Sequence, residues 1–142
     1  MKVADILRSK GSAVETVQPT DSVGVAVQKL ADFGIGALVV SSDNETVEGI
    51  LSERDVVRAI PDSDELTSTR VAELMTAKVT TCTPDQSVDD LVSMMTTGRI
   101  RHVPVQVDEK LVGIISIGDV VKVRLGELER ERSQLENYIS GR

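Results

Sequence analysis

The chain contains one pattern twice, and this repeat constrains the fold more than any other feature. The two copies lie about 65 residues apart within a sequence of 142 residues. Four segments of one copy match four segments of the other in the same order: 3–7 with 71–75, 16–19 with 81–84, 22–23 with 87–88, and 49–55 with 113–119. Four ordered matches are hard to attribute to chance. The sequence therefore predicts two similar units.

Each copy predicts the same series of elements. A short alternating segment at 14–17 meets Pro19 and is typical of a strand. Ser22 is a helix cap before apolar residues at helical spacing, and Ser87 has the same place in the second copy. The apolar positions of the two helices are Val23, Val27, Leu30 and Ala31, then Val88, Leu91, Val92 and Met95.

The rest of each copy predicts two strands and a last helix. Residues 37–40 and 103–105 are apolar enough for buried strands, and turn-forming residues at 43–45 and 108–110 lead to strands ending at 50–51 and 114–115. Ser52 and Ser116 then open helices. The predicted fold is mixed, of the α+β class, with tandem βαββα repeats.

The two copies define the domain organisation. A unit of about 60 residues has difficulty burying enough surface alone, so we expect the copies to pack about an approximate two-fold axis with clefts between them. Residues 1–66 form the first predicted domain, and residues 67–142 form the second together with a helical tail from Leu125 onward. That tail is expected to be exposed or to face a partner. The linker at 61–68 is expected to have no structure of its own.

Composition argues against several classes of protein. The net charge is −7 without any dense run of Lys or Arg, and Phe33 and Tyr138 are the only aromatic residues. Nucleic-acid and membrane binding are therefore not expected, because they depend on basic patches and stacking platforms. Cys82 is the single cysteine and is expected to be a buried structural thiol. Without an apolar leader or membrane-length segment, the expected location is cytoplasmic.

The strand-to-helix corners are the strongest candidate sites. Ser52 and Asp55 in the first copy, and Ser116 and Asp119 in the second, have the spacing of a helix capping box. The same groups suit a nucleotide, because a carboxylate accepts bonds from both hydroxyls of a ribose, while a hydroxyl and free helix amides suit a phosphate. The two roles are compatible, and the sequence leaves both open.

At these corners the sequence resembles CBS domain pairs, the regulatory modules first named from cystathionine β-synthase. The resemblance covers about residues 3–125 and is carried by Gly-Ile-Leu-Ser-Glu-Arg-Asp at 49–55, Gly-Ile-Ile-Ser-Ile-Gly-Asp at 113–119 and Arg-His-Val-Pro-Val at 101–105. It implies phosphate and ribose contacts for the Ser and Asp of each corner. It also implies adenine contacts for Gln18 with Ile50, and for Thr83 with Ile114.

The resemblance also implies a basic phosphate contact just before the middle strand. Arg101 and His102 have this place in the second copy, whereas the first copy has Gly36 and Ala37. The two clefts are therefore expected to differ in charge, and the first to depend on Arg54 or on side chains of the other copy. His102 is the single histidine, so no metal site is expected.

These features favour a non-enzymatic regulatory module. An adenine nucleotide (AMP, ADP, ATP or NAD/NADH) would bind between the repeats and report energy or redox state to an unknown target protein. The resemblance implies a homodimer, with the helices after Ser52 and Ser116 as contact surfaces. An enzyme is disfavoured because no nucleophile, acid–base pair or metal cluster converges. The alternative is a structural dimerisation module that binds no nucleotide.

Overall fold

The first half of the chain forms a three-stranded sheet with helices around it. The computed structural model describes residues 1–141. β2 pairs in parallel with β1 and antiparallel with β3, so the middle strand is central. The elements are α1 (Val3–Lys10), β1 (Thr16–Val17), α2 (Val23–Phe33), β2 (Ala37–Val40), β3 (Gly49–Ser52) and α3 (Glu53–Ala59). The βαββα order is confirmed here, although β1 begins later than predicted.

The second half repeats this arrangement with one strand reduced. β4 and β5 form an antiparallel pair, and Cys82 contributes only an isolated parallel bridge to Val105 where the first half has β1. The elements are α4 (Val71–Leu74), α5 (Val88–Gly98), β4 (His102–Val107), β5 (Lys110–Ser116) and α6 (Ile117–Ile139). The prediction of a full first strand in this copy is therefore wrong, because the pairing stops after one residue.

Local signals fix the ends of the central helices. Ser22 and Ser87 cap α2 and α5 by accepting the amides of Val25 and Asp90. α2 ends at Gly34, whose φ of 61° is in the left-handed region that glycine adopts readily. The predicted apolar face of α2 is only partly correct. Val23 and Leu30 are buried, whereas Val27 and Ala31 are exposed because Ala26 faces the core instead.

The segment that joins the two halves is more ordered than the sequence indicated. Residues 61–68 were expected to be unstructured, but single 3-10 turns form at Ile60–Asp62 (η1) and Leu66–Ser68 (η2). The second turn lies against α2, where the Thr67 carbonyl is so close to Gly24 that a Cβ on this glycine would be 3.0 Å away. The amide of Val23 also donates to the Thr69 carbonyl over 2.8 Å. Backbone contacts therefore order a segment whose side chains are mostly polar.

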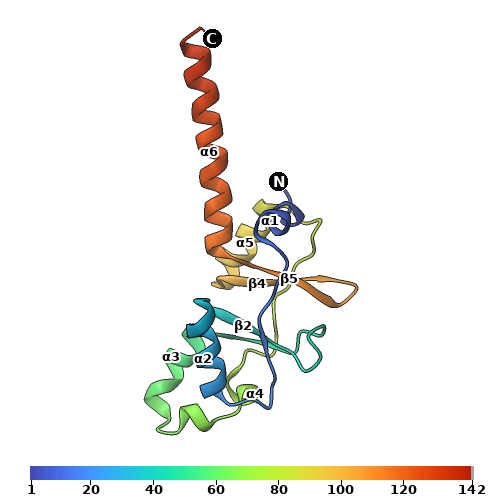
Figure 1. Cartoon of the computed structure of the whole chain (residues 1–142), viewed down its shortest axis with the longest axis vertical. Helices are drawn as coiled ribbons and strands as arrows, with labels where there is room; N and C mark the ends of the chain where they lie inside the picture. The colour runs from blue at the N-terminus through green and yellow to red at the C-terminus, as the bar shows by residue number, and fades with distance from the viewer. Residues whose placement is uncertain (142) are drawn as a thin grey trace.

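The two hydrophobic cores exchange their first helices. Val3 and Ile6 of α1 are buried with residues of the second half, including Leu91 and Ile115. Val71 of α4 is buried in the core of the first half. Figure 1 shows the result: α1 lies beside the start of α6, and α4 lies beside α2, at the opposite end of the body. Each half therefore completes the core of the other.

The repeated glycine at the start of Gly-Ile-x-Ser has a packing role in this exchange. A Cβ on Gly49 would collide with the side chain of Met75, just after α4. A Cβ on Gly113 would lie 2.5 Å from Leu7 Cδ2 in α1. The glycines let the exchanged helices approach the sheets closely, and this explains why both copies carry one at this point.

Candidate functional site

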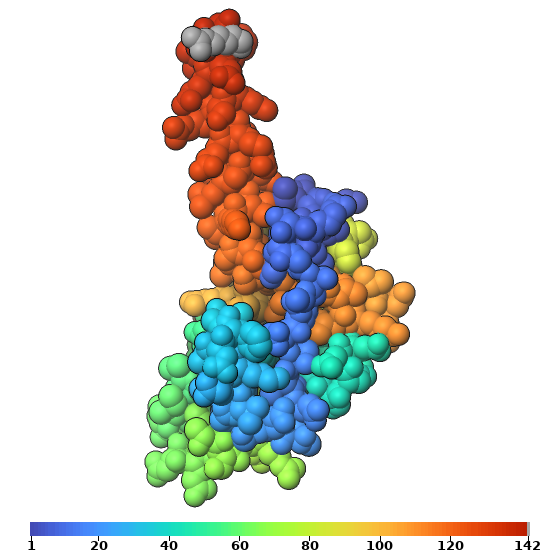
Figure 2. All heavy atoms as spheres, in the orientation of Figure 1, coloured from blue at the N-terminus to red at the C-terminus, as the bar shows by residue number. Residues whose placement is uncertain are grey.

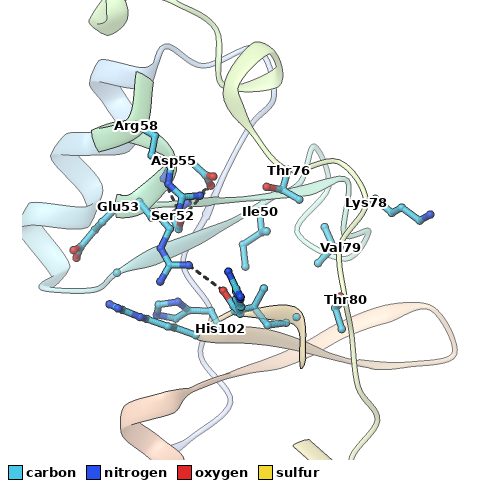
Figure 3. A pocket seen from close by; sticks show the side chains of 16 residues that line it. Ile50, Ser52, Glu53, Asp55, Arg58, Thr76, Lys78, Val79, Thr80 and His102 are labelled. Carbon is cyan, nitrogen blue, oxygen red and sulfur yellow. Dashed lines mark hydrogen bonds between the residues drawn. The ribbon is translucent and has the colours of Figure 1, made fainter. Parts of the chain in front are cut away.

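A cleft of about 460 Å³ lies between the two halves, within the range of small-molecule sites. In Figure 3, Ser52 and Asp55 stand on one wall, His102 stands on the opposite wall, and Ile50 lies between them. Sixteen residues line the cleft: Gly36, Ile50, Ser52, Glu53, Arg54, Asp55, Arg58, Thr76, Lys78, Val79, Thr80, Gly98, Arg99, Ile100, Arg101 and His102. The walls therefore come from both repeats.

The corner between β3 and α3 forms a complete capping box. Asp55 Oδ2 accepts the Ser52 amide at 2.9 Å and the Ser52 hydroxyl at 3.0 Å, and Ser52 Oγ accepts the Asp55 amide at 3.3 Å. Among the described residues, Asp55 Oδ1 has no hydrogen-bond partner. The capping function uses one oxygen of the carboxylate and leaves the other for a ligand, so the two roles expected for this corner are compatible.

Cations gather in this cleft although the chain as a whole is acidic. Five Lys and Arg side chains line it, against the carboxylates of Glu53 and Asp55: Arg54, Arg58, Lys78, Arg99 and Arg101. None of the five forms a salt bridge with a described residue. Lys78 extends away from the centre in Figure 3, so it contributes charge at the rim. An anion in the cleft would meet cations that are not paired with a carboxylate of the described residues.

One cation also ties the two repeats together. Arg54 Nη1 donates to the backbone carbonyl of Arg99 at 2.9 Å. Arg99 ends α5 with a left-handed φ of 52°, which turns this carbonyl toward the cleft region. A carbonyl of the second half therefore fixes the orientation of the Arg54 side chain, which belongs to the first half.

His102 lies against Gly36 of the other repeat. A Cβ on Gly36 would lie 3.1 Å from His102 Cε1, so a larger residue here would press on the ring. Burial lowers the pKa of His102 below its usual value, although Glu53 and Asp119 act in the opposite direction. The imidazole is therefore neutral at neutral pH, and it offers hydrogen bonding without adding charge.

The chain that leads into the second half forms the cleft's remaining edge. Ile50 and Thr76 form an isolated antiparallel bridge, with backbone bonds of 3.0 Å and 2.9 Å in the two directions. This bridge holds Val79 and Thr80 beside the cleft. The half-buried side chains of Ile50, Val79 and Ile100 provide the apolar surface on which a planar base can rest without aromatic residues.

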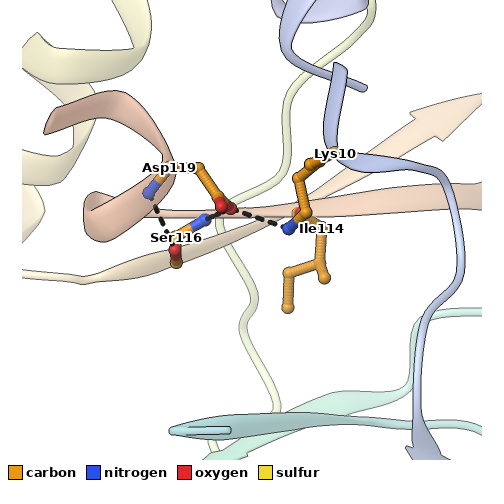
Figure 4. Close-up of polar contacts among 4 residues, drawn as sticks. All are labelled: Lys10, Ile114, Ser116 and Asp119. Carbon is orange, nitrogen blue, oxygen red and sulfur yellow. Dashed lines mark hydrogen bonds and ion pairs between the residues drawn. The ribbon is translucent and has the colours of Figure 1, made fainter. Parts of the chain in front are cut away.

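The second corner has the same capping box but is occupied by a lysine. Ser116 Oγ accepts the Asp119 amide at 3.1 Å, and Asp119 Oδ2 accepts the Ser116 amide at 2.8 Å. Lys10 Nζ lies 2.7 Å from the same Oδ2 and donates to the Ile114 carbonyl at 2.7 Å (Figure 4). The side chains of Lys10 and Asp119 are 29% and 22% exposed, so this pair is partly shielded from water.

The pKa of Asp119 is consistent with its ion pair with Lys10. Burial raises the pKa of the carboxyl, but the hydrogen bonds from Lys10 and from the Ser116 amide outweigh it and hold the pKa below its usual value. The carboxylate is therefore charged and already paired. The equivalent place in the first cleft is taken by the backbone of Thr76, which leaves Asp55 without a cation bonded to it.

The cleft brings together seven of the thirteen residues predicted from the sequence: Gly36, Ile50, Ser52, Arg54, Asp55, Arg101 and His102. Arg101 and His102 lie beside the second corner, as expected: His102 pairs with Ser116 across β4 and β5, and the Arg101 carbonyl accepts the Ile117 amide. Both residues also line the first cleft, where side chains of the other copy were expected. Ile114, Ser116 and Asp119 lie together at the second corner.

Three further predicted residues lie neither in the cleft nor at the second corner. Gln18 and Thr83 are exposed beyond its lining, and each uses its backbone amide to close a turn, donating to Asp21 and Gln86. Ala37 is 6% exposed and buried in β2, on the strand face opposite to the one that Leu38 and Val40 turn to the core of the first repeat. The segment 76–80, which leads into the second repeat, lines the cleft where Gln18 was expected.

Sequence reasoning missed four cations near the two corners: Lys10, Arg58, Lys78 and Arg99. Arg58 had a recoverable signal, because it follows Asp55 by three residues and so shares a face of the same short helix. The other three approach from distant segments and had none.

One further structural finding concerns membranes. Across residues 1–141, none of the helices combines the length and the apolar character that crossing a bilayer requires. The longest, α6, is rich in Glu and Arg.

Comparison with known proteins identifies the repeat. The family model described as "CBS domain" matches residues 3–62 and again residues 71–126. A mitochondrial CBS domain-containing protein of Arabidopsis thaliana is 35% identical over 98% of this chain and 72% of its own length. The expected cytoplasmic location is therefore not confirmed. An inosine-5'-monophosphate dehydrogenase of Methanocaldococcus jannaschii is 32% identical, but the match covers 22% of that enzyme.

Solved structures show the same architecture. A CBS-domain protein of Agrobacterium tumefaciens is 44% identical with a TM-score of 0.84, covering 87% of this chain and 99% of that one. Another from Burkholderia ambifaria is 42% identical with a TM-score of 0.85, covering 89% and 95%. A CBS domain pair solved with 5-methylthioadenosine and S-adenosyl-L-methionine is 26% identical with a TM-score of 0.79, covering 89% and 98%. The chain belongs to the CBS domain family, and its two repeats form one CBS domain pair.

Proposed function

We propose that the chain is a non-enzymatic regulatory module that binds a phosphorylated adenosine in the cleft between β3, α3 and β4. The observation that carries this proposal is the set of five cations lining the cleft with Asp55, which form no salt bridge within residues 1–141 although the net charge is −7. Asp55 Oδ1 would accept the ribose hydroxyls, and the adenine would rest on Ile50 and Val79. The phosphates would lie among Arg54, Arg99 and Arg101, beside the hydroxyl of Ser52.

Charge separates this ligand class from the one seen in a relative. The CBS pair solved with 5-methylthioadenosine and S-adenosyl-L-methionine shows that an adenosine group suits a related fold. The first of those ligands has no phosphate, and the second carries a positive sulfonium. Both would leave the Arg side chains of this cleft without a counter-charge, whereas AMP, ADP, ATP or NAD/NADH would neutralise them.

Binding would act on both repeats at once. Ser52, Arg54 and Asp55 belong to the first repeat, while Arg99, Arg101 and His102 belong to the second. A nucleotide contacting both sets stabilises one relative angle of the repeats over others, and a partner that recognises this angle receives the signal. The partner protein is the target of regulation, and the nucleotide is the input.

Thermal unfolding with added ligand tests the proposal. We expect AMP, ADP, ATP, NAD or NADH at about 100 times its dissociation constant to stabilise the protein by roughly 2.7 kcal/mol. 5-Methylthioadenosine and S-adenosyl-L-methionine at equal concentration serve as controls for adenosine without phosphate, and should give much smaller shifts. An equal shift with these controls would refute the role of the cations. No shift with any compound would favour the alternative, a structural dimerisation module without nucleotide.

We further propose that each chain binds one nucleotide, because Lys10 occupies the second corner. Isothermal titration should give one site per chain for the wild type. In Lys10→Ala the carboxylate of Asp119 loses its ion pair, and we expect a second, weaker site to appear. Lys110→Ala, which removes an exposed lysine from a hairpin, should leave the stoichiometry at one. Two sites in the wild-type protein would contradict this assignment.

A further inference from the structure

The C-terminal helix projects far from the body of the molecule. Figures 1 and 2 show α6 leaving the second repeat beside α1 and continuing alone. Its first turns are anchored, since Val120 is buried in the core and Arg124 forms an ion pair with Asp89 of α5. From residue 128 to residue 140, every residue is exposed. A lone helix of this length is marginal in water, so its stability requires a partner.

Apolar residues on this helix follow a heptad pattern. Starting at Val121, the positions step by four, three, four, three and four residues, which keeps one face in line. The members of this face, called the α6 stripe below, are Val121, Leu125, Leu128, Arg132, Leu135 and Ile139. The exposed fractions of Leu128, Leu135 and Ile139 are 60%, 62% and 82%. The stripe is therefore regular and uncovered, and it is interrupted only by Arg132.

We propose that the α6 stripe pairs with the stripe of a second copy of this chain, the two helices running antiparallel. This inference goes beyond nucleotide binding and does not depend on it. The stripe has the 3.5-residue periodicity of a two-helix seam, which a flat protein surface would not require. A second copy supplies an identical seam over about 28 Å of helix.

The charges that flank the stripe favour the antiparallel orientation. In a parallel pair, Arg132 would meet Arg132 of the other copy, and Glu131 would face Glu136 of the other copy. In an antiparallel pair, Lys122 lies beside Glu136 of the other copy, and Arg132 lies beside Glu129. The antiparallel pair therefore separates the two Arg132 side chains and gives each a carboxylate of the other copy, although it also brings Glu129 and Glu131 close to their equivalents.

The apolar layers also match in the antiparallel register. Leu125 faces Leu135 of the other copy, and Val121 faces Ile139, each twice because of the two-fold symmetry. Leu128 faces the aliphatic part of Arg132 at the centre. The bare end of each helix, including Tyr138, then lies along the anchored start of the other helix. A parallel pair would cover the same apolar residues, but it would leave the paired ends of both helices far from either body.

Disulfide trapping tests the pairing and its orientation in the full chain. In Leu125→Cys/Leu135→Cys, mild oxidation should give a covalent dimer through a bond between positions 125 and 135 of different copies, identified by peptide mass spectrometry. Each single variant should give at least tenfold less, because equivalent positions lie about 15 Å apart along the antiparallel axis. The native Cys82 does not compete, since burial raises the pKa of its thiol to about 11.

The controls use the other face of the same helix. Asn137→Cys combined with Leu125→Cys should not cross-link, because position 137 points away from the stripe. Leu128→Asp/Leu135→Asp should weaken self-association at least tenfold in sedimentation equilibrium, and Asn137→Asp should not. No covalent dimer from the Leu125→Cys/Leu135→Cys protein would overturn the pairing. A dimer formed equally well by Leu125→Cys alone would overturn the antiparallel orientation.

Discussion

Asp55→Ala is expected to weaken binding of the adenine nucleotide about 10- to 100-fold. The carboxylate is the group placed to accept both ribose hydroxyls, and a hydrogen bond to a charged group contributes about 1.5–3 kcal/mol. Among the described residues no lysine or arginine bonds to it, so the full charge is available to the ligand. Isothermal titration of wild type and variant with the nucleotide that gives the largest thermal shift measures the change.

Asp119→Ala is the matched control, because it removes the same residue from the same type of corner. Both substitutions break a capping box, which should destabilise the protein by about 0.5–2 kcal/mol, and Asp119→Ala also removes the ion pair with Lys10. Only Asp55 lies in the cationic cleft, so only Asp55→Ala should lose affinity. Equal losses in the two variants would mean that the effect comes from the helix cap. A loss confined to Asp119→Ala would move the site to the corner where Lys10 lies.

The repeat, the secondary structure and both corners could be predicted because each rests on short-range signals. Ser52 and Ser116 cap their helices through bonds to residues three positions away, and Gly34 ends α2 through its own backbone conformation. Such patterns are visible in a single sequence. The prediction placed Asp55 and Asp119 correctly at the starts of α3 and α6 for the same reason.

The arrangement of the two repeats could not be predicted, because it depends on which repeat each helix packs against. Duplicated units have similar apolar faces, so the sequence does not say whether α1 packs on its own repeat or on the other. The structure places α1 on the other repeat, and this exchange carries Lys10 to Asp119. The packing of the two repeats also lets Arg101 and His102 of the second repeat line the first cleft.

The exchange predicts a large effect at a residue far from the cleft. Ile6→Ala should destabilise the protein by about 2–5 kcal/mol, because it removes a fully enclosed side chain and leaves a cavity. Ile6 is 2% exposed and packs with Cys82, Leu91 and Ile115 of the second repeat. Urea unfolding measures the loss. Ile60→Ala removes an isoleucine that is 57% exposed and should stay within about 0.5 kcal/mol of the wild type.

The core that loosens in Ile6→Ala shows whether α1 packs on the second repeat or on its own. Cys82 is the single thiol, it is 2% exposed, and it lies in the same core as Ile6. Opening of that core exposes the thiol, so Ile6→Ala should speed labelling of Cys82 by a thiol reagent under native conditions. Ile60→Ala should not. If α1 instead packed on the first repeat, Ile6→Ala would loosen a core without this thiol. Labelling that stays at the wild-type rate, together with a loss of stability, would therefore contradict the exchange.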